Sequence, residues 1–118
     1  MCGIHGFQGN DTEKIKTMID LARHRGPDGS GYWSDEHITL GHNLLSIVDE
    51  VSPSTQPWIH HDLVLVYNGE IYNYKELRSN LNHEFSTNTD TEVLAVGLEQ
   101  QGKEFLYNID GMFALACY

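Results

Sequence analysis

Five consecutive residues in the middle of the chain, 63–67 (LVLVY), are all apolar or aromatic, and this run constrains the fold more than any other segment. A strand without alternating polar residues is typical of a sheet that is buried on both faces. Strand-like segments and one helix-like segment precede the run, two helix-like segments follow it, and a last apolar strand is expected at Gly111–Cys117. This order predicts an α+β or layered α/β fold. The length of 118 residues predicts a single domain, residues 1–118.

Turn formers, helix caps and apolar periodicity predict the remaining elements. The predicted strands are residues 3–7, a hairpin of 32–33 and 37–40 around 34–36, and residues 44–48. The predicted helices run from the cap residues 10–12 to near His24, over residues 74–81, and from the Thr89-Asp90 cap to Gly102. Residues 49–58 contain two prolines and are expected to form a loop.

The charge of the chain argues against several kinds of partner. Seven Lys and Arg stand against 17 Asp and Glu, which gives a net charge of −10. Such an acidic chain is not expected to bind nucleic acid or an anionic membrane surface. No apolar run approaches the ~18 residues of a membrane-spanning helix, and there is no signal-peptide pattern. The two cysteines lie at opposite ends and indicate no disulfide framework, so a reducing, cytoplasmic location is the default expectation.

Cys2 directly follows the initiator Met, and its small side chain would allow removal of Met1. A mature N-terminal Cys carries a thiol nucleophile and an α-amine on one residue. That amine has a pKa of about 8 and can act as the base, so no separate His is needed. Taken alone, Cys2 is better explained as a small residue that starts a strand.

Two further segments carry groups that could serve catalysis. Asn68 and Gly69 follow the buried run, and a side-chain amide with a glycine N–H could hold a developing oxyanion. In isolation, an ordinary Asn-Gly turn is the better explanation. Asp90, in the segment 89–92 (TDTE), could bind a substrate ammonium; in isolation a helix N-cap with an acidic first turn is the better explanation, and the two roles are compatible.

The order of several short blocks along the chain changes these odds. The blocks are residues 1–4 (MCGI), 23–28 (RHRGPD), 45–49 (LSIVD), 56–57 (QP), 67–73 (YNGEIYN), 89–92 (TDTE) and 110–114 (DGMFA). This series resembles the glutaminase domain of class II glutamine amidotransferases, and within them the asparagine synthetase branch. The resemblance runs nearly end to end.

The resemblance implies an N-terminal-nucleophile hydrolase fold with stacked sheets and flanking helices. It implies that Cys2 attacks the side-chain amide of glutamine, and that a thioester forms before water releases glutamate. It further implies that Asn68 and Gly69 form the oxyanion hole, and that Glu70 and Asp90 bind glutamine. The family's substrate-lining loop corresponds to Leu44, Leu45, Ser46, Ile47 and Val48.

The chain departs from the family pattern in two ways. Leu44 stands where the family has an Arg that clamps the α-carboxylate of glutamine, and an aliphatic side chain cannot replace that fork. Arg25, in the Gly- and Pro-rich turn, is the preferred substitute. The chain is also shorter than the family's glutaminase domain and lacks the synthetase domain, which predicts a truncated version of the fold. Missing strands would leave apolar surface that a homodimer would bury.

The predicted function is therefore that of a glutamine amidohydrolase that releases ammonia and glutamate, acting on glutamine or a related small amide and supplying a separate synthetase partner. The alternative is a non-catalytic module that keeps the fold and binds a small ligand or a protein. No cofactor is expected. Seven histidines without helical i, i+4 spacing give no metal prediction. Cys117, in an apolar strand, is predicted to be an inert core thiol.

Overall fold

The computed structural model describes residues 2–46 and 55–118, which form two three-stranded antiparallel sheets. The first sheet has the order β1-β3-β2, with β1 at Gly3–Gln8, β2 at Gly29–Ser34 and β3 at Ile38–Leu44. The second has the order β4-β5-β6, with β4 at Trp58–His60, β5 at Leu63–Ile71 and β6 at Gly111–Cys117. The strand predicted at the end of the chain is confirmed.

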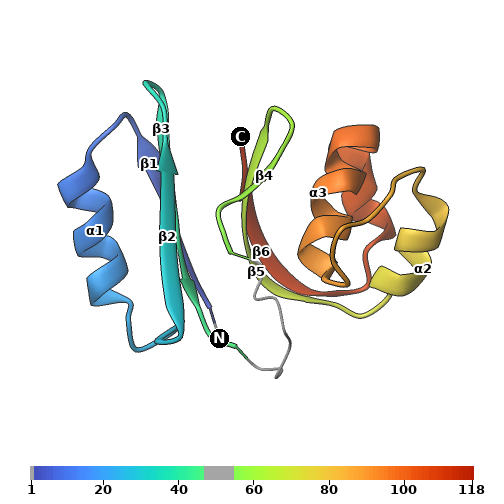
Figure 1. Ribbon diagram of the computed structural model, residues 1–118, viewed down its shortest axis with the longest axis horizontal. Helices are drawn as coiled ribbons and strands as arrows, with labels where there is room; N and C mark the ends of the chain where they lie inside the picture. The colour runs from blue at the N-terminus through green and yellow to red at the C-terminus, as the bar shows by residue number, and fades with distance from the viewer. Residues whose placement is uncertain (1, 47–54) are drawn as a thin grey trace.

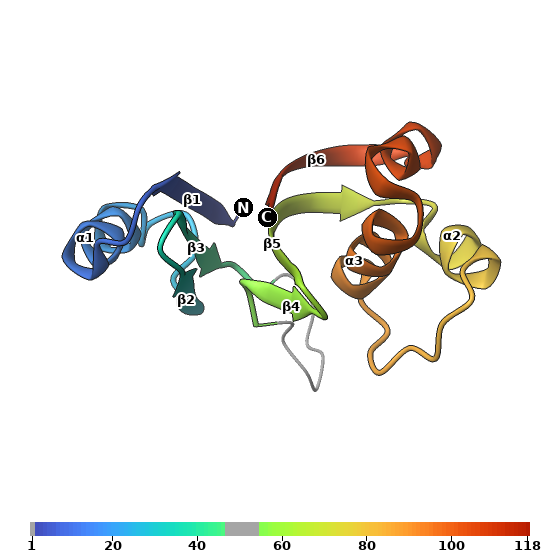
Figure 2. The ribbon, with the colours of Figure 1, turned by 90° about the horizontal axis from the view of Figure 1, so that it is seen from above.

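Helices cover the outer side of each sheet (Figure 1). They are α1 (Thr12–Leu21), α2 (Tyr74–Asn80), α3 (Asp90–Gln101) and the 3₁₀ helix η1 (Gly102–Asn108). Helix α1 packs on the first sheet, and α3 packs on the second with α2 and η1 beside it. The two sheets face each other between these helical layers, as the view from above also shows (Figure 2). The predicted layered α+β architecture is therefore confirmed.

Strand β5 lies at the centre of the molecule and contributes to both hydrophobic cores. Leu65, Tyr67 and Ile71 belong to the larger core, which lies under α2 and α3. Val64 and Val66 point the other way and meet Leu40 of the first sheet. Successive side chains of a strand lie on opposite faces, so the apolar run fills both cores at once. Burial of residues 63–67 on both faces is thus confirmed, with Leu63 itself half-buried.

Several predicted boundaries were wrong. The first helix ends at Leu21, before His24, because residues 22–26 form tight turns in which Arg25 N donates to Ala22 O. No separate strand starts at Leu44, which is the last residue of β3; residues 45–46 follow without strand structure, and 47–48 lie outside the described residues. The predicted loop 49–58 is outside them as far as residue 54, and Trp58 begins β4.

Three further corrections concern the second half. Strand β5 continues through Asn68 and Gly69 to Ile71, because β6 pairs along this whole stretch. Helix η1 was not foreseen, since its residues lack apolar periodicity. Cys117 is exposed and not part of the core, because it is the last residue of β6 and lies beyond the residues that pack against the cores. Among the described residues, no helix combines the length and hydrophobicity that a membrane crossing requires.

Candidate active site

Cys2 lies just before β1, where two other segments meet it. Its Sγ accepts a hydrogen bond from Leu45 N at 3.3 Å and lies 3.8 Å from Leu45 O. Its carbonyl oxygen accepts from Arg25 Nε at 3.4 Å. The next residue, Gly3, pairs with Asn43 of β3. The thiol is therefore held by the backbone of the segment that follows β3, and Arg25 lies beside the same residue.

The turn at residues 23–28 fixes the segment around Leu45. Asp28 N donates to Leu44 O at 2.9 Å, and Ser46 N donates to Asp28 Oδ2 at 2.7 Å. Gly26 is buried against the same strand end, and a Cβ there would come within 2.6 Å of the carbonyl carbon of Asn43. Asp28 was present in a recognised block, but sequence reasoning assigned it no role.

Asn68 and Gly69 are part of β5, so the interpretation as an Asn-Gly turn is wrong. They pair with Ala114 and Phe113 of β6. A Cβ on Gly69 would lie 2.3 Å from Met112 O, so glycine is required here by close backbone approach and not by turn geometry. Asn68 is half-buried, whereas Gly69 and Glu70 are exposed. The pair thus forms an accessible position at the end of the buried run.

Asp90, the first residue of α3, is tied to β5 by its side chain. Its Oδ2 accepts from Tyr67 Oη at 2.7 Å and from Ile71 N at 3.1 Å. Thr89 is the N-cap of α3, so the cap that the sequence predicted is confirmed. These contacts bring Asp90 to the same strand as Asn68 and Gly69.

Tyr67 and Gln56 support this arrangement, although sequence reasoning gave neither a role. Burial, and then the hydrogen bond to Asp90, raise the pKa of Tyr67 well above its usual value, so its hydroxyl remains a donor. The charges of Asp90 and Glu70 contribute to the same shift. Gln56 Oε1 accepts from Tyr67 N at 2.6 Å. Both residues belong to recognised blocks, which was the available signal.

The predicted site residues form two groups from opposite sheets. Cys2, Arg25, Leu44, Leu45 and Ser46 cluster at one end of the first sheet. Asn68, Gly69, Glu70 and Asp90 lie on β5 or the helix bonded to it. Strand β1 packs against β5, and within the described residues no hydrogen bond joins the two groups. Ile47 and Val48 lie outside the described residues.

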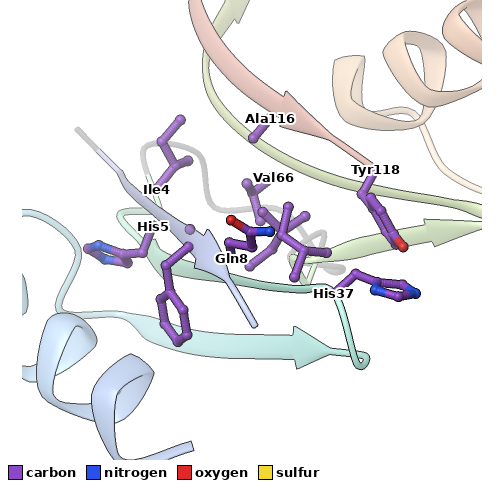
Figure 3. A pocket seen from close by; sticks show the side chains of 11 residues that line it. Ile4, His5, Gln8, His37, Val66, Ala116 and Tyr118 are labelled. Carbon is purple, nitrogen blue, oxygen red and sulfur yellow. The ribbon is translucent and has the colours of Figure 1, made fainter. Parts of the chain in front are cut away.

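A cavity of about 540 Å³ opens between the two sheets (Figure 3). Ile4, His5 and Gln8 of β1 line it, together with Val66, Ala116 and Tyr118. None of the predicted site residues lines this cavity. The candidate site is therefore defined by the two clusters and not by this cavity.

Comparison with known proteins agrees with the blocks in the sequence. A family model described as a glutamine amidotransferase domain matches residues 1–118. Asparagine synthetase [glutamine-hydrolyzing] 3 of Arabidopsis thaliana is 45% identical over 97% of this chain and 21% of its own length. Asparagine synthetase B [glutamine-hydrolyzing] of Escherichia coli (strain K12) is 39% identical over 100% of this chain and 23% of its own length. The chain thus spans about a fifth of these relatives, and it belongs to the class II glutamine amidotransferase domains of the asparagine synthetase type.

Proposed function

We propose that this chain hydrolyses the side-chain amide of glutamine to glutamate and ammonia, with Cys2 as the nucleophile. The observation that carries the proposal is the placement of Cys2 at the start of β1, with its Sγ held by Leu45 N and its carbonyl held by Arg25. These contacts fix the residue whose thiol and amine the reaction needs. Family membership supports the choice of glutamine.

The bond changes and proton transfers of the proposed reaction need only the terminal residue and water. After removal of Met1, Cys2 Sγ attacks the amide carbon of glutamine while the α-amine takes the thiol proton. That proton passes to the leaving nitrogen, the C–N bond breaks, and ammonia departs from a thioester. Water then attacks the thioester, the C–S bond breaks, and glutamate and the free thiol are formed. An amine with a pKa of about 8 can both take and return a proton near neutral pH.

The oxyanion of both tetrahedral intermediates is proposed to be stabilised by the Asn68 side-chain amide and the Gly69 N–H. Two observations support this assignment. Asn68 and Gly69 lie at an accessible position at the end of the buried run, and their pairing with β6 fixes the strand backbone there. Donors that do not reorganise during the reaction stabilise developing charge most effectively. We assign Glu70, exposed beside them, to binding glutamine.

Asp90 is proposed to bind the α-ammonium group of glutamine. Both of its described hydrogen bonds go to Oδ2, and within the described residues Oδ1 accepts none. A carboxylate that is oriented by a tyrosine hydroxyl and a backbone N–H keeps its second oxygen in a fixed direction. That oxygen is available for a charged substrate group.

The α-carboxylate is the part of glutamine for which the site is least complete. Leu44 ends β3 opposite Gly29 and offers no charge. Arg25 is exposed and lies within hydrogen-bonding distance of Cys2 O, which supports its role as the substitute cation. Leu44 also favours a second candidate function, in which the domain binds a small ligand or a protein without catalysis.

The ammonia is proposed to pass to a synthetase, as the names of the relatives suggest for those proteins. The direct test incubates the purified protein with glutamine and measures glutamate and ammonia, with intact mass spectrometry to establish whether Met1 is removed. Glutamate formation by the Met1-free form supports the proposal. A protein that has lost Met1 and still forms neither glutamate nor a Cys2 adduct is the non-catalytic module.

A further inference from the structure

Two adjacent histidines at the β4–β5 hairpin converge on one glutamate of α3, far from the site above. His60 Nε2 lies 2.8 Å from Glu99 Oε2, and His61 Nδ1 is hydrogen-bonded to Glu99 Oε1. The two imidazole ring centroids are 4.4 Å apart. Glu99 is 38 residues beyond His61 in the chain, so no spacing in the sequence announces this cluster. Figure 1 shows the hairpin of β4 and β5 beside α3.

The backbone at His61 is what places both rings on the same side. Consecutive side chains of a strand point to opposite faces, which would separate two neighbouring histidines. His61 instead has φ of 51°, in the left-handed region that non-glycine residues seldom adopt. It is the first residue of the two-residue turn between His60 and Leu63, which pair across the hairpin. The turn therefore brings both imidazoles to the Glu99 carboxylate.

We propose that His60, His61 and Glu99 form a binding site for one divalent transition-metal ion, such as Zn²⁺. The three potential ligand atoms lie within 4.8 Å of one another. Bonds of 2.0–2.2 Å in a tetrahedral site put ligand atoms about 3.4 Å apart, so a small side-chain adjustment completes the geometry. Two imidazoles and one carboxylate are ligands that late first-row divalent ions accept, whereas Mg²⁺ and Ca²⁺ prefer sites built from oxygen.

The burial of the ligands fits a site of this type. The His60 side chain is only 11% exposed, whereas His61 is 71% exposed and Glu99 34% exposed. One ligand is thus anchored in the fold, and the other two leave the ion reachable from solvent. His83 packs edge-on against His60, with ring centroids 5.2 Å apart, and this contact restrains the orientation of the His60 ring. Three protein ligands leave a fourth position for water.

The bound ion would fasten the hairpin to α3. Ligands that bind only the folded state raise its stability, so the melting temperature should rise with metal concentration. This consequence does not depend on glutamine hydrolysis, and a failure of either proposal leaves the other unaffected.

The test is isothermal titration of the full chain with ZnCl₂, alongside thermal unfolding. The wild type is expected to bind one Zn²⁺ per chain and to gain melting temperature with Zn²⁺ but not with Mg²⁺. Loss of an outer partner of a metal ligand already costs about 10–100-fold in affinity, so Glu99→Gln should weaken binding by at least ~100-fold. His61→Asn should have a similar effect, and Asn also tolerates the left-handed backbone. His37→Ala, which removes an exposed histidine elsewhere, is the matched control and should bind like the wild type.

Co²⁺ identifies the ligands independently. A tetrahedral Co²⁺ spectrum without a thiolate charge-transfer band is expected. A thiolate band would mean that Cys2 or Cys117 holds the ion and would overturn the proposal. Unchanged affinity in both Glu99→Gln and His61→Asn, or no stoichiometric binding by the wild type, would overturn it as well. Because His61 is exposed at the turn, His61→Asn keeps the test valid if Glu99→Gln does not fold.

Discussion

The region around the first sheet and the region around the second differ in how many apolar residues they bury. Among the described residues, the core under α2 and α3 contains ten buried residues and the core shared between the two sheets contains three, while Ile15 and Ile19 of α1 are buried on the first sheet. The candidate nucleophile, Cys2, comes from the first region and is held by backbone contacts to the segment after β3. The groups proposed to bind and stabilise the substrate come from the second, where helix, strand and side-chain bonds reinforce one another.

This contrast suggests a division of labour between the two regions. A reacting group needs access and some freedom to move, whereas groups that stabilise a transition state must not reorganise. The well-packed second region suits the oxyanion and ammonium positions. The first region, which has a single helix and one thiol at its edge, suits the group that forms and breaks bonds.

The sharpest test of the comparison is Cys2→Ala, with the largest expected effect. It should abolish glutamine hydrolysis, because the nucleophile is lost, and leave the circular dichroism spectrum and melting curve unchanged, because Cys2 is only half-buried. Cys117→Ala is the matched control and should retain full activity, since that thiol is exposed on β6. Retained hydrolysis in Cys2→Ala would show that the first region does not carry the chemistry.

Asn68→Ala tests the second region. Turnover should fall by about 10²–10³ while the Michaelis constant changes much less, because an oxyanion donor acts mainly in the transition state. Steady-state kinetics with glutamine separate the two parameters. A change confined to the Michaelis constant would make Asn68 a ground-state binding residue instead.

The junction of the two sheets should be sensitive to acid. His42 is 1% exposed, and burial lowers its pKa from 6.5 to about 4, against a backbone hydrogen bond to Tyr67. Between these pH values the His42 imidazole binds a proton in the unfolded chain but not in the folded protein. The free energy of unfolding should therefore drop by about 3 kcal/mol as the pH falls from 6.5 to 4.

Urea denaturation at several pH values measures this loss, and His42→Gln, which cannot titrate, should flatten the curve over that range. Glu92 adds to the loss at lower pH. Burial would raise its pKa, but hydrogen bonds from Thr87 and Ser86 outweigh burial and keep the pKa below its usual value. The contribution of Glu92 to the free energy of unfolding is fully present above the pKa of Glu92 in the unfolded chain. It is lost as the pH falls through the lower pKa of Glu92 in the folded protein. A curve for His42→Gln that parallels the wild type would contradict the assignment to His42.

Leu44→Arg tests whether the first region still accommodates the α-carboxylate of glutamine. The new guanidinium should tighten glutamine binding by about 1.5–3 kcal/mol, the worth of a charge-assisted hydrogen bond. Binding titrations with glutamine and with a simple amide that lacks the carboxylate make the comparison. No gain for glutamine, together with better binding of the simple amide by the wild type, would mean that the specificity has changed.

A pair of glycine variants compares the packing of the two sheets directly. A Cβ on Gly69 would meet backbone atoms of β6, at 2.3 Å from Met112 O, whereas a Cβ on Gly41 would meet the end of the Ile15 side chain at 2.7 Å. Side chains can move aside and paired strands cannot. Gly69→Ala should therefore cost about 1–3 kcal/mol of unfolding free energy, and Gly41→Ala less. If urea denaturation shows equal losses of unfolding free energy for the two variants, the two sheets do not differ in how tightly they pack at these glycines.

Local signals were enough to predict much of the fold and the residues of the candidate site. The apolar run of β5, the Thr89 cap of α3 and the apolar strand β6 each depend on neighbouring residues, and each was predicted correctly. The ordered blocks named Cys2, Asn68 and Asp90 because their identities and order carry that information. Strand β4 escaped prediction because its three residues are shorter than any periodic signal.

The sequence by itself determined the layered architecture and the family, and it named the candidate reacting groups, because patterning, capping and the order of short blocks can be read from the chain alone. Only the tertiary structure decided that Asn68 and Gly69 lie in a strand, since an Asn-Gly pair suits a turn until β6 pairs with it. It also decided that Asp90 reaches Tyr67, and that two histidines meet Glu99. These contacts join residues more than twenty positions apart, and side-chain directions over such distances are set by packing, not by local preference.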